Sequence, residues 1–274
     1  MLLNSNIFTN TNPNVPQFKT MATLLLPLTL LTITITIAGP VPPPDLTRCG
    51  SALKPDNKTA VSCCLPVGNN KIIDFTPPSF SSLRVRPAAH LVDESYIAKY
   101  TKAVETIKAL GRDHPWSHLQ QANIHCAYCN GAYNMPGYNV SMQVHSSWLF
   151  FPFHRMYLYF YERILGKVIG DDTFAIPFWN WDAPGGMTMP KMYVNASSAL
   201  HDPFRSEAHL PPKIVHINFS NHTDAPKAVN LTDRNLRTVY RQMVYASTAQ
   251  LFIGSRYVAG MQPSPGGGSI LRWF

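Results

Sequence analysis

The sequence has few charged residues and no run of them. Only 14% of the 274 residues are charged, and 23 basic against 15 acidic residues give a formal charge of +8. The basic residues are scattered singly, without the clustered stripe that neutralises a phosphate backbone, so we predict no nucleic-acid partner. No internal repeat is visible, which excludes a repeat array. The 45% of hydrophobic residues suffice for one sizeable core.

Charge is almost absent from the first 44 residues, where Lys19 is the single charged group. Residues 21–38 are apolar apart from threonine, end in alanine and are followed by Gly-Pro. Their length is at the lower limit for a membrane helix, and their arrangement is that of a cleavable export signal. We therefore predict a targeting segment over residues 1–44 and no stable membrane span after its cleavage. A retained membrane anchor is the alternative.

Cysteine is scarce, and its odd number leaves one thiol to explain. The Cys126-x-x-Cys129 pair could be a redox motif or half of a zinc site, but the chain has no second such pair and no thioredoxin-like pattern around it. Cys63 and Cys64 are adjacent and cannot easily pair with each other. Each of these two cysteines therefore needs a distant partner.

Three histidines stand in an aromatic and nearly uncharged stretch of the chain. They are His125, His145 and His154. Neutral imidazole is a ligand for copper, zinc, iron and nickel. Without a partnering carboxylate, three imidazoles favour copper, or zinc with an open position, over a hard oxygen-loving ion.

The spacing of these histidines excludes one continuous helix. His145 and His154 are nine residues apart, which at 100° per residue is a half turn after whole turns are removed. Pro152 supplies a break, because proline is favoured in the first turn of a helix. We expect a helix that starts near Phe151 and carries His154 in its opening turn. His145 then lies on the segment leading in, and His125 comes from a third element.

The remaining histidines lack a spacing that would gather them around a metal. His114 and His118 are four apart, but Pro115 places the first of them at a helix start, and we predict a structural role for both. The later histidines are spaced by eight, seven and six residues in a segment rich in proline and asparagine, and we predict solvated loop residues. They are His201, His209, His216 and His222.

Helical periodicity recurs outside the histidine-rich stretch. Residues 95–111 place apolar side chains on one face, and a helix within 115–127 would carry His125. Residues 234–254 carry another stripe, which includes Leu236 and Tyr240, and we expect it to pack into the core behind a cap at Asp233. Residues 183–232 read as irregular, short edge strands could form near residues 82–87, and Trp179 and Trp181 suit packing. The fold class is thus mainly α, a helix bundle with long loops.

Several motifs together resemble one family. The stretches QQANIHCAYCNGAY, QVHSSWLFFPFHRMYLYFYERILGKVIGD and FAIPFWNWDAPGGM are similar to the first-copper half of plant polyphenol oxidases. These are catechol oxidases of the tyrosinase family, with a type-3 copper site. The likeness implies a tyrosinase-type copper-binding domain over residues 45–274. It also implies that His125, His145 and His154 bind the first copper.

The same resemblance implies a second copper, with three further histidines in a later part of the family's sequence. Here the last histidine is His222, and the sequence ends at Phe274. We therefore expect a domain that is incomplete at its C-terminus and that stops before the second-copper helices. One copper ion is expected in this chain, against two in the complete family site.

The resemblance also implies a bonding partner for each of the five cysteines. By this likeness Cys49 pairs with Cys64, and Cys63 pairs with Cys126. The remaining Cys129 would form a thioether to the ring of His145, which would fix the orientation of that imidazole. A buried free thiol is the alternative for Cys129.

At family level, the resemblance implies copper-dependent oxidation of o-diphenols (catechols) to o-quinones by O₂, with a small phenolic substrate. The alternative is a non-catalytic protein that binds one copper, or a vestigial one. Family members usually reach the thylakoid lumen of the chloroplast, which is the location expected here. The vacuole or secretion is the alternative, because six Asn-x-Ser/Thr tripeptides would be usable on a secretory route. Their asparagines are Asn57, Asn139, Asn195, Asn218, Asn221 and Asn230.

Overall fold

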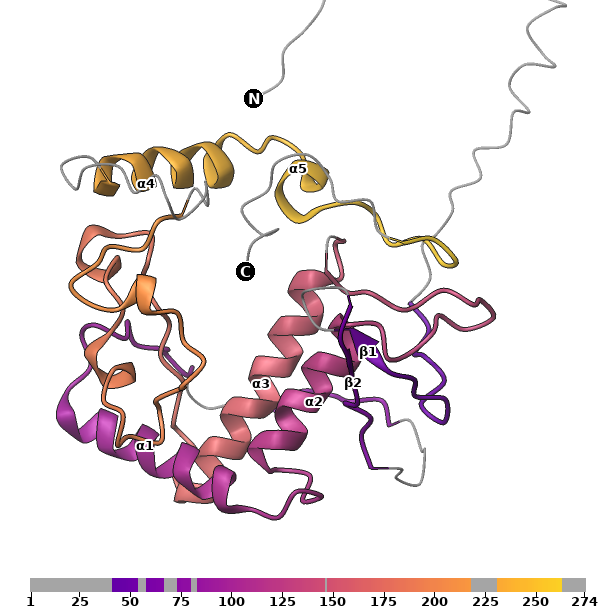
Figure 1. Ribbon diagram of the computed structural model, residues 1–274, viewed down its shortest axis with the longest axis horizontal. Helices are drawn as coiled ribbons and strands as arrows, with labels where there is room; N and C mark the ends of the chain where they lie inside the picture. Colours follow the sequence, from indigo (N-terminus) through magenta and orange to yellow (C-terminus); the bar gives the residue numbers. More distant parts are fainter. Residues whose placement is uncertain are drawn as a thin grey trace, which may run out of the picture. The chain divides into compact units, whose positions relative to one another are not determined.

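Helices dominate the part of the chain that the structure describes, as Figure 1 shows. The structure is a computed structural model, and the residues that it describes are 41–53, 58–66, 73–79, 83–145, 147–217 and 231–262. The elements are β1 (Ala52–Leu53), β2 (Ala60–Val61), α1 (Glu94–Ala109), α2 (His118–Cys129), α3 (Phe150–Ile169), the 3-10 turns η1 (Pro184–Gly186), η2 (Lys191–Tyr193) and η3 (Glu207–His209), α4 (Leu231–Val239), the π-helical η5 (Tyr240–Val244) and α5 (Ala249–Ile253).

Helix α1 forms where the apolar periodicity predicted a helix. Its N-terminus is capped by Asp93, whose carboxylate accepts a hydrogen bond of 2.8 Å from the backbone N–H of Tyr96. The predicted face is the buried one: Val104 and Ile107 are buried, and Ile97 packs against them. This helix therefore gains its stability from the core it covers rather than from its own propensity.

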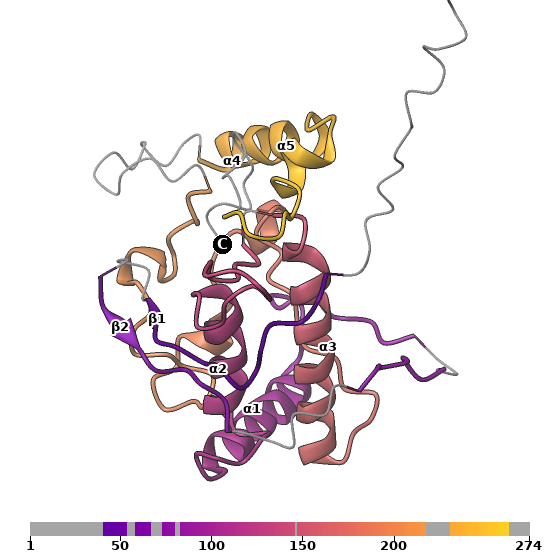
Figure 2. The ribbon, with the colours of Figure 1, turned by 90° about the vertical axis from the view of Figure 1, so that its right-hand side faces the viewer.

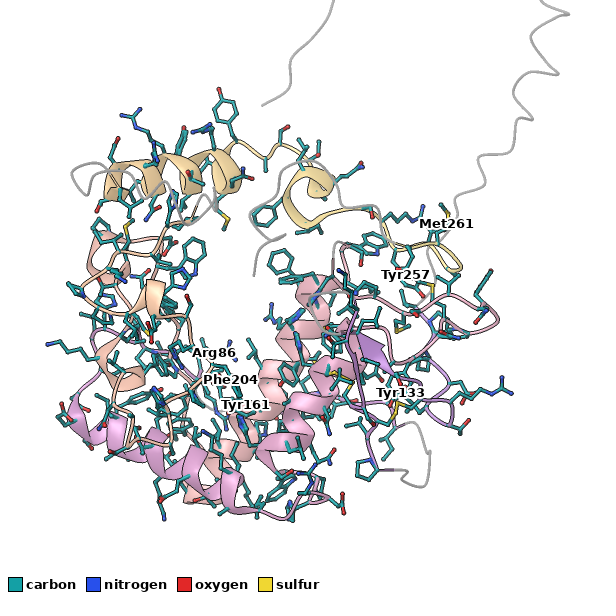
Figure 3. The ribbon with its side chains drawn as sticks, viewed as in Figure 1. Arg86, Tyr133, Tyr161, Phe204, Tyr257 and Met261 are labelled. Carbon is teal, nitrogen blue, oxygen red and sulfur yellow. A yellow bond between two sulfur atoms is a disulfide. The ribbon has the colours of Figure 1, made fainter. Side chains whose placement is uncertain are left out.

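The main core lies between α1, α3 and the irregular segment after α3. Its fully enclosed members include Leu165 of α3 and Phe174, with Met192 of η2 and Leu200 beside them. Tyr161, labelled in Figure 3, packs against the same cluster. Helix α3 ends at Gly170, whose φ of 69° is the left-handed conformation that glycine adopts without strain. The long third helix thus has one face committed to this core.

A second, smaller core lies between α2 and the β1–β2 pair. Tyr133, labelled in Figure 3, is buried there with Ala127 and Ala52. The two strands pair antiparallel, with Ala52 opposite Val61. Two disulfides fasten this arm, one joining Cys49 to Cys64 and the other joining Cys63 to Cys126 of α2. The N-terminal part of the described chain is thereby bound covalently to the helix that carries His125.

The strands expected near residues 82–87 do not form in the described residues 83–87. That segment is extended, but only Ala88 makes a bridge, to Phe178. The reason is that Arg84 and Arg86 turn toward the buried carboxylate of Glu162 on α3, at 3.9 and 2.9 Å. The segment is held by this charge cluster, so it needs no strand partner. The only strands among the described residues are β1 and β2.

The C-terminal helices differ from the prediction for residues 234–254. The expected single helix is broken into α4, η5 and α5, and Asp233 lies inside α4, where it pairs with Arg237 at 2.8 Å, instead of capping it. The apolar stripe is not buried: Leu236 and Tyr240 are exposed, and the buried side chains of α4 are polar. The prediction of core packing for this stripe is therefore wrong, because the apolar partner it needs is not present among the described residues.

The prediction of an irregular segment over residues 183–232 agrees with the structure for residues 183–217 and fails at residues 231 and 232, which already belong to α4. Residues 183–217 contain short 3-10 turns and one isolated bridge between Thr188 and Ile214, and residues 218–230 lie outside the described residues. In the view of Figure 2, α3 runs beside α2 and reaches down alongside α1. Trp179 packs against the irregular segment and donates its indole N–H to the carbonyl of Gly186 at 2.7 Å.

Residues 42–274 form one unit and residues 1–41 another. The predicted targeting segment, residues 1–44, lies almost entirely outside the described residues, as do four of the six Asn-x-Ser/Thr asparagines and His222. Among the described helices, none is both long enough and apolar enough to cross a membrane.

Candidate metal centre

Three separate elements bring His125, His145 and His154 together. His125 lies on α2, His145 lies in the turn before α3, and His154 lies on α3. The ring centroids are 5.5 Å apart for His125 and His145, 5.2 Å for His125 and His154, and 5.3 Å for His145 and His154. The chain break that the spacing required is present, since α3 begins at Phe150, one residue earlier than predicted. Pro152 lies in its first turn, where proline costs no intrahelical hydrogen bond.

The orientation of the His154 ring follows from one backbone contact. Its Nδ1 lies 2.6 Å from the carbonyl oxygen of Phe150. A carbonyl oxygen can only accept, so Nδ1 carries the hydrogen and Nε2 of the neutral ring has a free lone pair. That Nε2 lies 3.1 Å from Nε2 of His125. Two ligand atoms therefore face the same small space.

A cysteine completes the cluster. The thiol of Cys129 and one ring nitrogen of each of the three histidines all lie within 4.8 Å of one another. Cys129 is buried and is a free thiol. In the part of the chain that the structure describes, this is the only group of three or more histidine, cysteine or carboxylate side chains close enough to hold an ion.

Aromatic rings enclose the cluster. The ring of Phe150 lies 4.3 Å from that of His154, and the ring of Tyr157 lies 5.8 Å from that of His125. The hydroxyl of Tyr157 donates to the carbonyl of Gln121 at 2.8 Å, which ties α3 to α2 beside the histidines. Tyr157 is a residue of the site that was not predicted from the sequence. Its three-residue spacing from His154 was the available signal, because that spacing puts both on one face of α3.

Burial lowers the basicity of two of the imidazoles, those of His125 and His145. It lowers the pKa of His145 to about 4, with the nearby His154 and His125 rings adding to the effect. Burial, and then the neighbouring His154, also lower the pKa of His125. Burial raises the pKa of the Cys129 thiol to about 12. At neutral pH His125 and His145 are therefore unprotonated and able to bind a metal, while the free thiol keeps its proton.

The donor set fits a copper ion. It consists of three imidazoles with a soft sulfur beside them and no carboxylate, which disfavours magnesium, calcium and manganese. The hydrogen bond from His154 Nδ1 to a backbone carbonyl is the outer contact that metal-bound histidines usually make.

The other histidines lie apart from this cluster. The Nδ1 of His114 accepts a hydrogen bond of 3.1 Å from the backbone N–H of Trp116, and His118 is the first residue of α2. His201, His209 and His216 lie on the irregular segment after α3, as predicted, but all three are half-buried instead of fully solvated. None of these five belongs to a candidate metal group within the described residues.

The family model described as the common central domain of tyrosinase matches residues 115–265, more than half of the chain. The chain belongs to the tyrosinase family. The matched region includes α2, α3 and all members of the histidine and cysteine cluster.

Plant enzymes are among the similar proteins. Aureusidin synthase of Antirrhinum majus is 53% identical over 242 residues, which cover 86% of this chain and 42% of that protein. A chloroplastic polyphenol oxidase of Malus domestica is 50% identical over 235 residues, covering 85% of this chain and 40% of that protein. This chain thus spans about two fifths of the length of the curated relatives it matches.

The fold is that of solved polyphenol oxidases. The crystal structure of Grenache (Vitis vinifera) polyphenol oxidase superimposes with a TM-score of 0.78 at 48% sequence identity, covering 85% of this chain and 69% of that one. The predicted fold class, a mainly α bundle of the tyrosinase type with few short strands, is confirmed. Copper is the metal of this family, and copper B is named in the description of a similar aurone synthase structure.

Proposed function

We propose that His125, His145 and His154 bind one copper ion through their ring nitrogens. The observation that carries this proposal is the approach of the His125 and His154 Nε2 atoms to 3.1 Å, with the His145 ring 5.5 and 5.3 Å from theirs. A hydrogen bond between these two nitrogens would use only one lone pair, whereas a cation bound by both rings would use the lone pairs of both. The lowered pKa of His145, about 4, keeps protons from competing.

We further propose that the family-level reaction is the oxidation of an o-diphenol to an o-quinone. Two diphenols each lose two electrons and two protons, and one O₂ takes up four of each to give two waters. Copper bound at the histidines would supply the one-electron steps that connect the diphenol to dioxygen. The names polyphenol oxidase and catechol oxidase, carried by relatives 50% and 48% identical, support this reaction.

The chain's own residues would shape that chemistry. Phe150 and Tyr157 line the cluster and suit an aromatic ring, which they would hold by apolar contact. The hydrogen bond from His154 Nδ1 to the carbonyl of Phe150 would keep Nε2 of the same ring pointing at the cluster while substrate enters.

Cys129 is proposed to form a thioether with the ring of His145. Its thiol is buried within 4.8 Å of the three ligand nitrogens and has no disulfide partner. The reaction removes the thiol hydrogen and one ring hydrogen, and the two electrons and two protons pass to dioxygen. Intact mass then falls by two hydrogens beyond the loss from the two disulfides. If Cys129 of the copper-loaded, denatured protein can be alkylated, there is no thioether.

The relatives named chloroplastic support a plastid location for this chain. The proposed targeting segment over residues 1–44, rich in uncharged polar and apolar residues, suits such a route. Delivery to the thylakoid lumen is the finer proposal. Imported protein whose new N-terminus lies near residue 45 would support it.

A second candidate function is binding of a single copper without turnover. It is favoured by one observation: the described residues contain one group of candidate ligands, whereas the family resemblance implies two copper ions. A single ion supplies one electron at a time, so the oxidation of a diphenol by this chain alone would be slow.

Copper titration of the purified chain tests the first proposal. We expect one copper per chain, and we expect His154→Ala to weaken binding by more than about 100-fold, because losing a ligand costs more than losing its outer contact. His201→Ala, on the loop after α3, is the matched control and should bind normally. Equal binding by His154→Ala would contradict the proposal. Oxygen uptake with catechol then separates the two functions, since only the oxidase consumes O₂ in proportion to bound copper.

A further inference from the structure

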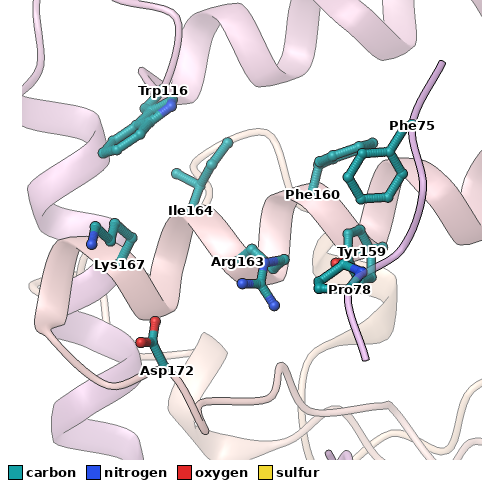
Figure 4. Close-up of a pocket in the computed structure, with 9 residues that line it drawn as sticks. All are labelled: Phe75, Pro78, Trp116, Tyr159, Phe160, Arg163, Ile164, Lys167 and Asp172. Atoms are coloured by element: carbon teal, nitrogen blue, oxygen red, sulfur yellow. The ribbon is translucent and has the colours of Figure 1, made fainter. Parts of the chain in front are cut away.

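A cleft lies on the side of α3 that faces away from the histidines. Arg163 is nine residues beyond His154, which on a helix is a half turn, so the two side chains leave α3 in opposite directions. The cleft has a volume of about 450 Å³. As Figure 4 shows, its walls come from α3, from the turn before α2 and from the extended segment 73–79. The lining residues are Phe75, Pro78, Trp116, Tyr159, Phe160, Arg163, Ile164, Lys167 and Asp172.

Its walls are unusually aromatic for a surface. Phe75 contacts Phe160 edge-on with ring centroids 4.9 Å apart, and it also contacts Tyr159 at 5.7 Å. Three of these rings keep a large exposed area: Phe75 43%, Trp116 40% and Phe160 41%. Large exposed apolar surfaces gathered around a concave site mark a place where a ligand or partner binds.

The floor of the cleft carries two cations one helical turn apart. The guanidinium of Arg163 lies over the ring of Tyr159, with its central carbon 5.7 Å from the centroid. Lys167 is exposed, and within the described residues its amino group has no ion pair. Asp172 also lines the cleft, so its described lining residues carry two positive charges and one negative. Its net charge is positive, which favours an anionic ligand.

We propose that this cleft binds a small planar aromatic carboxylate. The aromatic part of the ligand packs against the rings of Phe75 and Phe160, which lie together at the end of the cleft away from Trp116 (Figure 4). Its carboxylate pairs with Arg163 and Lys167, since a guanidinium and an ammonium on successive turns can both reach one anionic group. The apolar walls explain the preference for an aromatic body, and the positive floor explains the preference for an acid over a neutral phenol. The cleft is independent of the metal centre, and the proposal does not rest on the proposed oxidase function.

Saturation-transfer NMR on the full chain tests this proposal, with cinnamate as the probe and cinnamamide as its neutral analogue. A ligand of this size should bind with a Kd on the order of a millimolar. We expect Lys167→Gln and Arg163→Gln each to weaken cinnamate binding by up to about fivefold, the loss expected for an ion pair in an open cleft. Asp172→Asn should strengthen it by about twofold, because a like charge is removed. Cinnamamide should bind more weakly than cinnamate and should not respond to these changes.

Two controls isolate the cleft. Lys191→Gln removes an exposed lysine of η2, outside the cleft, and should leave cinnamate binding unchanged. His154→Ala, and copper-free protein, should bind cinnamate as the copper-loaded chain does, whereas binding lost with copper would place the acid at the metal. Circular dichroism establishes that each variant folds. Equal binding of acid and amide, or no response to Lys167→Gln and Asp172→Asn in folded protein, would overturn the proposal.

Discussion

Helices α1 and α4 carry the same kind of apolar stripe and use it differently. In α1 the stripe is buried against α3, with Ile107 fully enclosed. In α4 the stripe faces outward, Leu236 is 38% exposed, and polar Asn235 is the residue that is fully buried. Periodicity therefore predicts that a helix forms and which face is apolar. Whether that face is buried depends on a second apolar surface that packs against it, and the periodicity of one helix does not predict that surface.

The contrast extends to the way each region is fastened. The α1–α3 region has a continuous apolar core and a buried charge cluster around Glu162. The α4 region is held by hydrogen bonds from one asparagine: Asn235 accepts from the N–H of Ile217 at 3.2 Å and donates to the carbonyl of Val215 at 2.6 Å. The metal centre lies on α2 and α3, so its ligands are placed by the better-packed region.

A matched pair of leucine truncations tests this contrast most strongly. Leu165→Ala on α3 removes a fully buried side chain and should lower the free energy of unfolding by about 3 kcal/mol or more. Leu236→Ala on α4 removes an exposed one and should change it by less than about 0.5 kcal/mol. Urea unfolding of the copper-free chain measures both. Equal losses would show that α4 is packed as firmly as α3.

Two variants that each remove a carboxylate should show a smaller difference in the free energy of unfolding, again with the larger loss in the α1–α3 region. Glu162→Gln leaves Arg84 and Arg86 without their carboxylate and should cost about 2 kcal/mol, because a buried pair loses one partner. Asp233→Asn breaks the exposed pair with Arg237 on α4 and should cost about 0.3–0.5 kcal/mol. Thermal unfolding reads both. A large effect of Asp233→Asn would contradict the view that α4 is held mainly by Asn235.

Asn235→Ala should act locally. It leaves the N–H of Ile217 and the carbonyl of Val215 without their partner, at a cost of about 1–2 kcal/mol. Hydrogen exchange should become faster across α4 and stay unchanged in α1 and α3. If exchange in α3 also accelerated, the two regions would form one cooperative unit.

The smallest effect concerns acid stability near the end of α3. Hydrogen bonds from Thr173 and the amino group of Lys99 lower the pKa of Asp171 to about 2. Because the pKa is lower in the folded chain than in the unfolded one, the stabilisation is present above about pH 4 and is lost as the pH falls toward 2. Asp171→Asn should therefore destabilise slightly at pH 6 and not at pH 2. A deficit that persists at pH 2 would rule out this origin.

Much of the fold and of the candidate site follows from the sequence. The nine-residue spacing and Pro152 required a break between His145 and His154, and the apolar face of α1 defined half of the main core. What the sequence could not give depends on tertiary contacts. From the sequence, Asn235 would be a surface residue, but in the fold its side chain is hydrogen-bonded to Val215. Tyr157 would be a core residue, but in the fold its hydroxyl donates to a carbonyl of α2. Arg84 and Arg86 looked like strand residues because Glu162 is 76 residues away from Arg86.

X-ray absorption spectroscopy of the copper-loaded chain tests the central claim most directly. Three imidazoles from α2, from the turn before α3 and from α3 should surround one ion, so the spectrum should show imidazole scattering with about three nitrogen neighbours. His154→Ala should reduce that number, and His201→Ala should not. Scattering without imidazole, or a spectrum identical in wild type and His154→Ala, would contradict the account.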